Sequence, residues 1–344
     1  MNNIKLLIFA LLISIISATI YLKQGPIFAL LAPSQTQFTT QIEGQHFPLS
    51  LHDPSGIRYT LTQSPQRLLS ATLATDHILS DLISPHRLVA VSQYVDYPSL
   101  SNIVGLYDDS ISRTQGEIES MLALQPDLVF VASYSNPETV RYLLRSGIAV
   151  VRLSEFNSFN DIINNIRLVA TVTDTTAKAN KVINNLQTRI NLVKKQVQGK
   201  EKPRILYYDL NGYSVGGHSL MNEAIDIAGG INVAQGAIPD GEHKISEELA
   251  ISLQPDVIIM NKWVFNQSQG QQSPVEILKN KSAWKNVPAV SNNRVYAVPG
   301  TWLRSVSQHR IKGVEAIANL LHPAIISDDN IHTEKTNNKV ENVQ

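Results

Sequence analysis

Apolar residues occur along much of the chain in short runs that are separated by longer segments with helical spacing. Before residue 160 these runs are 67–70, 88–92, 128–132 and 149–153, and after residue 200 they are 204–208, 257–260 and 295–298. Short apolar runs bounded by turn residues are typical of buried strands. Because strands that alternate with helices form parallel sheets, the pattern predicts an α/β fold with a sheet in each half of the chain.

A long segment without strand character separates the two halves. Between residues 161 and 199 the apolar residues follow helical spacing, with a break near Thr173 and Asp174. After the break they recur at every third or fourth position, at Ile183, Leu186, Ile190, Val193 and Val197. We interpret Asp174 as the cap of a helix that runs to about residue 198 and is roughly 37 Å long. We expect this helix to join two lobes.

The residues before the first lobe have a different pattern. Residues 32–45 are polar and rich in Gln and Thr, which predicts a linker. Apolar and polar residues alternate in 47–51 and again in 57–61, around the turn sequence Asp-Pro-Ser-Gly at 53–56. This combination predicts a β-hairpin, so residues 32–65 are interpreted as a linker followed by a hairpin.

Both ends of the chain carry segments that do not fit a folded lobe. Residues 6–22 are an apolar stretch of 17 residues between Lys5 and Lys23. That length is short for a membrane span and long for the core of a cleaved leader, so residues 1–31 are either a signal peptide or a membrane anchor. Retention as an anchor is slightly favoured, because the small-residue site after Ala18 lies inside the apolar stretch. Residues 324–344 are polar and charged, which predicts a disordered tail.

One sequence pattern occurs twice. Glu-Ser-Met-Leu-Ala-Leu-Gln-Pro-Asp at residues 119–127 is echoed by Glu-Leu-Ala-Ile-Ser-Leu-Gln-Pro-Asp at residues 248–256, and an apolar run follows each copy. In each copy the proline ends a short helix and a buried strand begins after the aspartate. Two copies on either side of the long helical segment 161–199 predict two similar lobes, residues 66–160 and 200–323.

Composition narrows the function. The chain has 344 residues, which is enough for two lobes with separate cores. Its 29 basic and 29 acidic residues cancel, and because no long basic run occurs, nucleic acid is not an expected partner. The absence of cysteine excludes disulfides, thiolate metal sites, cysteine nucleophiles and the lipid-modified cysteine that anchors many bacterial binding proteins.

Several segments occur in an order that matches a known family. They are Arg-Leu-Leu-Ser-Ala-Thr-Leu-Ala-Thr-Asp at 67–76, Arg-Leu-Val-Ala-Val-Ser-Gln-Tyr-Val-Asp-Tyr-Pro at 87–98, Val-Gly at 104–105, the first repeat copy, Gly-Gly-Ile-Asn at 229–232 and Ile-Ser-Glu-Glu at 245–248. Together they resemble the Fe/B12-type periplasmic binding proteins, which include vitamin B12-binding and ferric siderophore-binding members. The resemblance implies a class III fold, in which one long backbone helix joins two Rossmann-like lobes with central sheets. Asp76 departs from the family pattern, where Glu is usual.

The resemblance also implies a function. It indicates an extracytoplasmic solute-binding protein, periplasmic or anchored to the inner membrane, that captures an iron chelate (siderophore or haem) or cobalamin in the cleft between the lobes. The partners would be the permease of an ABC importer and its ATPase, and no cofactor is expected. The alternative is a membrane-tethered structural or sensory homologue without a transport role, which the unusual N-terminus favours. A receptor that docks through both lobes is expected to be a monomer.

Candidate ligand-binding residues follow from the position of loops relative to the sheets. In open parallel sheets the binding crevice lies beyond the carboxyl ends of the strands, and here those loops are rich in aromatic residues. We therefore predict a ligand site formed by Tyr94, Tyr97, Tyr107, Tyr134, Tyr213, His243, Trp263, Trp302 and Arg304. Aromatic rings would offer contact area to a corrin, porphyrin or siderophore, and Arg304 would pair with an acidic group. The alternative for each ring is packing at the edge of a lobe.

Two carboxylates stand apart from the ligand candidates. Glu119 and Glu248 open the two copies of the repeat, each seven residues before the proline. By resemblance they are predicted to dock onto arginines of the permease. The alternative is that each simply complements the dipole of its helix, which stabilises a helix by about 0.3–1 kcal/mol.

Enzymatic function is not predicted. Gly216-Gly217-His218-Ser219 lacks the surrounding pattern of a nucleophile turn. The nine histidines show no metalloprotease spacing, so a zinc enzyme is not indicated. His218 and His243 are candidates for an axial ligand to a bound haem or cobalamin, and whether any side chain contacts the metal is left open.

Overall fold

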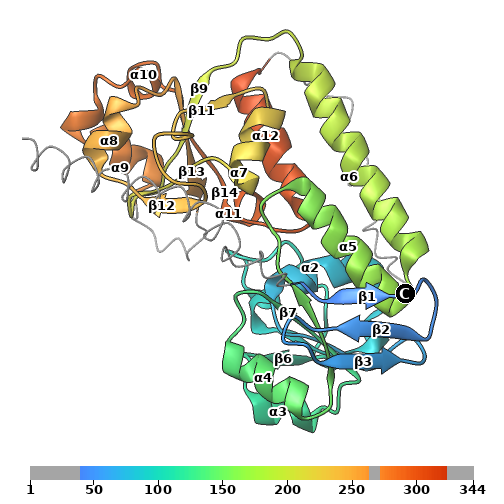
Figure 1. Cartoon of the computed structure of the whole chain (residues 1–344). Coiled ribbons are helices and arrows are strands. Elements are labelled where there is room, and N and C mark those ends of the chain that lie inside the picture. The colour runs from blue at the N-terminus through green and yellow to red at the C-terminus, as the bar shows by residue number, and fades with distance from the viewer. Residues whose placement is uncertain (1–38, 263–271, 324–344) are drawn as a thin grey trace, which may run out of the picture. The chain divides into compact units, whose positions relative to one another are not determined.

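The computed structural model describes residues 39–262 and 272–323, which form two α/β lobes (Figure 1). The predicted signal peptide or anchor at 1–31 and the predicted tail at 324–344 lie outside the described residues. Across 39–262 and 272–323, no helix combines the length and the apolar character needed to span a membrane.

The N-terminal lobe is built on a five-stranded parallel sheet with the order β6-β5-β4-β7-β8. Its strands are β4 (Leu68–Ser70), β5 (Leu88–Ser92), β6 (Ser112–Thr114), β7 (Leu128–Ala132) and β8 (Ala149–Leu153). The helices are α2 (Leu73–Leu82), α3 (Ile118–Ala123) and α4 (Pro137–Arg145), with 3-10 turns η1 (Pro85–Arg87) and η2 (Gln93–Asp96). All of β7 is buried, as expected where helices cover both faces of a sheet. The sequence did not predict β6, because its residues are polar.

The C-terminal lobe is built on a four-stranded parallel sheet with the order β11-β9-β13-β14. Its strands are β9 (Arg204–Tyr207), β11 (Ile231–Asn232), β13 (Val257–Lys262) and β14 (Val295–Pro299). A separate antiparallel pair consists of β10 (Tyr213–Val215) and β12 (Glu242–Lys244). The helices are α7 (Leu220–Ile227), α8 (Glu247–Ser252), α9 (Pro274–Asn280), α10 (Pro288–Ser291), α11 (Gly300–Leu303) and α12 (Ile311–Leu321), with 3-10 turns η3 (Ser282–Trp284) and η4 (Gln308–Arg310).

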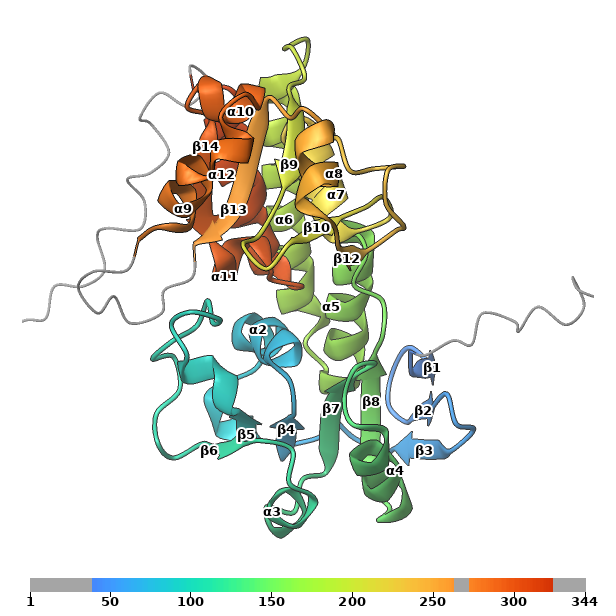
Figure 2. The ribbon, with the colours of Figure 1, turned by 90° about the vertical axis from the view of Figure 1, so that its left-hand side faces the viewer.

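Two helices, α5 (Phe159–Thr173) and α6 (Thr176–Val197), connect the lobes (Figure 2). The prediction of one long connecting helix is confirmed, since α6 packs on both α2 and α12. The predicted role of Asp174 is wrong. Its backbone is left-handed (φ 57°) and its N–H bonds to Ala170 and Thr171, so it ends α5, and Thr175 precedes α6. Aspartate tolerates this conformation better than most residues, which explains the break at this position.

A small antiparallel sheet precedes the first lobe. It contains β1 (Gln41–Glu43), β2 (Leu49–His52) and β3 (Arg58–Leu61). The predicted hairpin is confirmed, because β2 pairs with β3 in a register that joins Leu49 to Leu61. The linker prediction is wrong at 41–43, where β1 pairs with β2. Just before β1, the backbone N–H of Thr40 donates to the carbonyl of Arg152, which covers the edge strand β8.

The repeated sequence has the same local structure in both lobes. Asp127 lies between α3 and β7, and its carboxylate accepts the backbone N–H of Arg67 before β4. Asp256 lies between α8 and β13, and its carboxylate accepts the backbone N–H of Arg204 at the start of β9. Each aspartate N–H in turn donates to the carbonyl of the same arginine. The repeat therefore fixes the entry of two neighbouring parallel strands in each lobe.

Hydrogen bonds from side chains join the lobes beside α6. The amide of Asn102 donates to the carbonyl of Thr301 at 2.7 Å. The amide of Gln308 donates to the carbonyl of His77 and to the carboxylate of Asp81 in α2. The largest apolar core cluster contains buried residues of both lobes and of α5, α6 and α12, so the two sheets share one continuous core.

Candidate functional site

Two adjoining cavities share part of their walls; residues of both lobes line the smaller one, and residues of the N-terminal lobe alone line the larger one. The smaller, of about 200 Å³, is lined by Leu73, Ala74, His77, Ser99, Leu100, Tyr134, Gly300, Arg304, Ser305 and Val306. The larger, of about 460 Å³, is lined by Ala71, Thr72, Leu73, Tyr94, Leu100, Gln115, Gly116, Val131, Tyr134, Ser135, Asn136, Thr139 and Val140. Because Leu73, Leu100 and Tyr134 line both, we treat the two as one site and call it the cleft.

The N-terminal lobe supplies the aromatic surface of the cleft. Tyr94 is 45% exposed and Tyr134 is 63% exposed, so both rings leave much of their surface accessible. Both follow strands of the sheet: Tyr94 lies in η2 directly after β5, and Tyr134 lies after β7. The Tyr94 ring packs on Tyr97, with centroids 5.8 Å apart, and the Tyr134 ring packs on Phe156 at 5.9 Å. These rings are therefore held in place from behind while their faces stay accessible.

The floor of the cleft is the first turn of α2. The Thr72 hydroxyl caps this helix by accepting the N–H of Thr75. Asp76 lies beneath the cap and is completely buried, and its carboxyl accepts both the N–H and the hydroxyl of Ser92 at the end of β5. Burial raises the pKa of Asp76 to about 7, although the bonds from Ser92 act in the opposite direction. Asp76 thus ties α2 to β5 below the ligand-facing surface.

Stability should depend on pH through Asp76. Between about pH 4 and pH 7 the unfolded chain releases this proton and the folded chain keeps it, so the carboxyl lowers stability as the pH rises. Asp76→Asn resembles the protonated form at every pH. We expect the variant to gain roughly 2 to 3 kcal/mol relative to the wild type between pH 5 and pH 8, measured by urea unfolding. A difference that stays constant over this range would show that Asp76 does not titrate in it.

The C-terminal lobe contributes a polar wall. Arg304 follows α11, lines the smaller cavity, and forms an ion pair with Glu242 of β12, with nitrogen and oxygen 2.8 Å apart. The side chain of Tyr207, at the end of β9, is buried and hydrogen-bonds to Arg304. The Tyr207 hydroxyl also accepts the amide N–H of Asn261. The sequence identified Arg304 because it follows β14, and Leu73 and Leu100 were missed because isolated leucines carry no such signal.

Of the remaining predicted ligand residues, those that the structure describes do not line the two cavities. Tyr213 and His243 belong to the β10–β12 pair, and the His243 ring contacts the carbonyl of Asp240 at 2.8 Å. Tyr97 supports Tyr94. Trp302 is half-buried against the shared core. Trp263 lies outside the described residues.

The prediction for Tyr107 is corrected by its burial. This residue is only 6% exposed and belongs to the shared core. Burial raises the pKa of its hydroxyl, which has no hydrogen-bond partner within the described residues. A side chain in this position supports the N-terminal lobe and offers no surface to a ligand.

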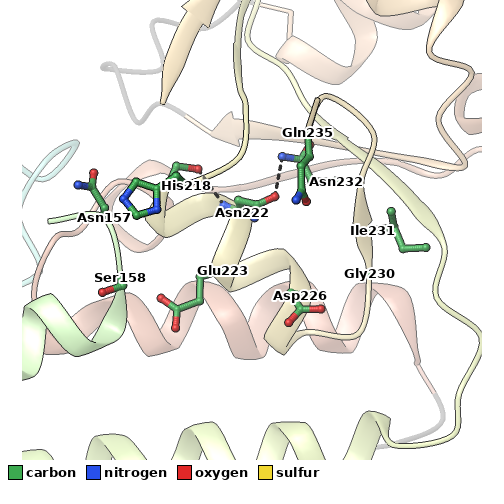
Figure 3. Close-up of a pocket in the computed structure, with 11 residues that line it drawn as sticks. Asn157, Ser158, His218, Asn222, Glu223, Asp226, Gly230, Ile231, Asn232 and Gln235 are labelled. Carbon is green, nitrogen blue, oxygen red and sulfur yellow. Dashed lines mark hydrogen bonds between the residues drawn. The ribbon is translucent and has the colours of Figure 1, made fainter. Parts of the chain in front are cut away.

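A further cavity, of about 500 Å³, lies on the flank of the C-terminal lobe and is polar (Figure 3). It is lined by Asn157, Ser158, His218, Ser219, Asn222, Glu223, Asp226, Gly230, Ile231, Asn232 and Gln235. Its Glu223 carboxylate accepts the N–H of Phe159 at the start of α5, and Asn222 and Asn232 bond to each other. No Phe, Tyr or Trp is among its lining residues, and 39–262 and 272–323 contain no cluster of His and carboxylate groups suited to a metal ion. The cleft is therefore the better candidate for a large chelate.

The carboxylates of the repeat occupy equivalent places. Glu119 is the second residue of α3 and Glu248 is the second residue of α8. Both are exposed and neither forms an ion pair within the described part of the chain. The neighbouring Glu247 differs, because its carboxylate bonds to Lys281 and to the indole of Trp284. Glu119 and Glu248 can therefore contact a partner protein, each from the same position in its helix.

Comparisons with known proteins agree with this architecture. A sequence model of the periplasmic binding protein family matches residues 69–301. The ABC transporter substrate-binding lipoprotein YvrC of Bacillus subtilis, itself uncharacterised, is 21% identical over 286 residues, which cover 80% of this chain and 86% of YvrC. A cobalamin-binding protein of Halobacterium salinarum is 23% identical over 284 residues, which cover 81% of this chain and 76% of that protein.

A solved structure shows the same fold. The periplasmic heme-binding protein RhuT from Roseiflexus sp. RS-1 superposes with a TM-score of 0.63 and 20% sequence identity, and the match covers 77% of this chain and all of RhuT. The family match spans both lobes and the helices that join them. This chain therefore belongs to the periplasmic binding protein family.

Proposed function

We propose that this protein is the extracytoplasmic receptor of an ABC importer and that it captures an iron chelate, haem or cobalamin in the cleft. The observation that carries the proposal is the cleft itself, which has exposed tyrosines on one lobe and Arg304 on the other. Its larger cavity, of about 460 Å³, falls within the size range of small-molecule sites, and the smaller cavity adjoins it. The relatives that bind cobalamin and heme support the same ligand class. Capture and delivery require no bond to be made or broken, so no enzymatic step is part of the proposal.

The partners in this proposal are the permease and the ATPase of the importer. YvrC, which is similar to this chain, is named as the substrate-binding lipoprotein of an ABC transporter. This chain has no cysteine to carry the lipid of a lipoprotein, so we propose that residues 1–31 direct it across the membrane as a leader or hold it there as an anchor.

Direct titration tests the proposal. The protein is titrated by calorimetry with cyanocobalamin, with haemin and with a panel of ferric siderophores. We expect one class of chelate to bind with one ligand per protein. Absence of binding across the whole panel would argue against a chelate receptor.

The matched test of the site uses two exposed tyrosines. Tyr134→Ala removes a ring from both cavities and should weaken binding of the identified chelate about tenfold to one-hundredfold, because apolar contact area is lost. Tyr142→Ala removes a ring of similar exposure (53%) from α4, outside the cleft, and should leave affinity unchanged. Equal effects of the two substitutions would place the ligand elsewhere.

A further inference from the structure

The polar cavity on the flank of the C-terminal lobe is separate from the cleft (Figure 3). Its volume of about 500 Å³ lies within the range of small-molecule sites. The residues that line it come from the segment before α5, from α7 and the residues directly before it, and from β11 and its neighbours. None of them also lines either cavity of the cleft. A ligand held here would therefore leave the cleft free for the chelate.

Hydrogen bonds of Asn232 hold one wall of this cavity in a fixed arrangement. Asn232 is only 5% exposed, and its amide N–H groups donate to the carbonyls of Val215 and Gly216 and to Oδ1 of Asn222. Its own Oδ1 accepts the N–H of Ala234, so both ends of the Asn232 amide are in use. Because Asn222 accepts through Oδ1, its Nδ2 is the end that remains, and it donates no hydrogen bond within the described part of the chain. This wall therefore offers a ligand one amide donor whose orientation is set by its neighbours.

Two carboxylates line the same cavity, one helical turn apart on α7 (Figure 3). Oε2 of Glu223 accepts the backbone N–H of Phe159 at 2.7 Å, and its Oε1 accepts no hydrogen bond from any described residue. One oxygen of Asp226 lies 3.3 Å from Nζ of Lys202, and both of these side chains are largely exposed. An exposed ion pair of this kind is weak. Glu223 and Asp226 therefore both keep an oxygen that a ligand can reach.

The charged residues that line the cavity have a single sign. They are the two carboxylates, and no Lys or Arg is among the described residues of the lining. Partial burial raises the pKa of Glu223, which shows that its carboxylate has already lost part of its solvation. A positively charged ligand would replace that solvation by direct bonds. A bare metal ion is not favoured, because 39–262 and 272–323 contain no group of three His, Cys, Asp or Glu side chains that could hold one.

We propose that this cavity binds a small organic ammonium ion, as a second ligand that is distinct from the chelate. The ammonium group donates to Oε1 of Glu223 and shares its charge with Asp226. Nδ2 of Asn222 donates to a second polar group of the ligand, such as a hydroxyl. Because Asn157 and Ser158 precede α5 whereas α7 belongs to the C-terminal lobe, the ligand would strengthen the connection that Glu223 already makes between α7 and α5. The inference does not depend on what the cleft binds.

Paired ligands of similar size and different charge test the inference. The whole chain is titrated by calorimetry with putrescine and 1,4-butanediol, and with glucosamine and glucose. We expect at least one amine to bind with one ligand per protein, and about tenfold or more tightly than its uncharged counterpart. Glu223→Gln keeps an oxygen for the N–H of Phe159 and should remove most of that preference. Glu138→Gln removes the same charge from the exposed first turn of α4 and should leave the preference unchanged.

The ratio of the two affinities distinguishes a binding role of Glu223 from a structural one. A structural role alone would change the affinity for an amine and for its uncharged counterpart to the same extent, and that result would overturn the inference. If Glu223→Gln does not fold, Asp226→Asn, which alters an exposed side chain, should lower the ratio in its place. Equal affinity of the wild type for both members of each pair, or no binding of either amine, also overturns the inference. These outcomes leave the chelate receptor untouched, because cyanocobalamin, haemin and the siderophores are titrated separately.

Discussion

Reversing the charges of Glu119 and Glu248 together is expected to abolish uptake of the chelate without changing its affinity for the receptor. Both carboxylates are exposed, unpaired within the described residues, and placed at the second position of α3 and α8. Neither residue lines the cleft. If they meet arginines of the permease, as we propose, lysine at both positions replaces two attractions by two repulsions. Like charges across an interface cost several kcal/mol, which is enough to prevent docking at ordinary concentrations.

The control for this experiment makes the same change in net charge, and one of its two positions also matches the helix position. Glu138 is the second residue of α4 and is exposed, and Glu201 is an exposed residue of the C-terminal lobe. The double variant Glu138→Lys, Glu201→Lys should take up the chelate normally in cells that lack the wild-type receptor. If the Glu119→Lys, Glu248→Lys variant takes up the chelate normally while present at the same level, the docking role is wrong. The two carboxylates would then only complement the dipoles of their helices.

The largest expected effect on stability comes from Gly216→Ala. A Cβ atom at this position would lie 1.9 Å from the carbonyl oxygen of Pro239. That oxygen belongs to the backbone, so no side-chain rotation can relieve the clash. The amide of Gly216 is also fixed, because it donates to the carbonyl of Gly241 at 2.8 Å. We expect a loss of at least about 3 kcal/mol in the free energy of unfolding, since tight packing resists added atoms.

Gly236→Ala is the matched control. Gly236 has a left-handed backbone (φ 78°), but a Cβ atom there meets no atom within 4 Å. Its substitution should cost only about 1 kcal/mol, the strain of an alanine in that conformation. Thermal and urea unfolding of both variants measure the difference. Comparable losses at the two positions would mean that the loop around Pro239 moves freely enough to accommodate the extra atom.

The central strands and α6 could be predicted from the sequence because the burial of apolar residues determines where they form. Strands β5, β7 and β8 begin and end as expected, since each is a run of residues that helices cover on both faces. Short polar strands such as β6 and β12 form only because neighbouring strands pair with them, so their residues carry no comparable signal. Asp174 was misplaced because an aspartate between two helices can start the second or end the first, and only its backbone angle decides.

Only some of the cleft residues could be predicted from the sequence, because packing decides which way a side chain faces. Tyr94, Tyr134 and Arg304 could be proposed because each follows a strand whose carboxyl end is fixed by the sheet. Whether an aromatic ring after a strand faces the cleft or the core depends on packing, and Tyr107 lies in the core. The burial of Arg310 could not be predicted, since an arginine before a helix is ordinarily exposed.

The bonds between the lobes have a consequence for the energetics of transport. Hydrogen bonds from Asn102 to Thr301 and from Gln308 to His77 and Asp81 join the lobes beside α6. If a ligand binds in the cleft as proposed, these bonds limit the movement of one lobe against the other, so we expect little of the binding energy to be spent on domain closure. The same bonds would also resist a separation of the lobes that lets the ligand leave. We therefore expect the work of release to come from outside the receptor, through a force that separates α3 from α8 and breaks these bonds.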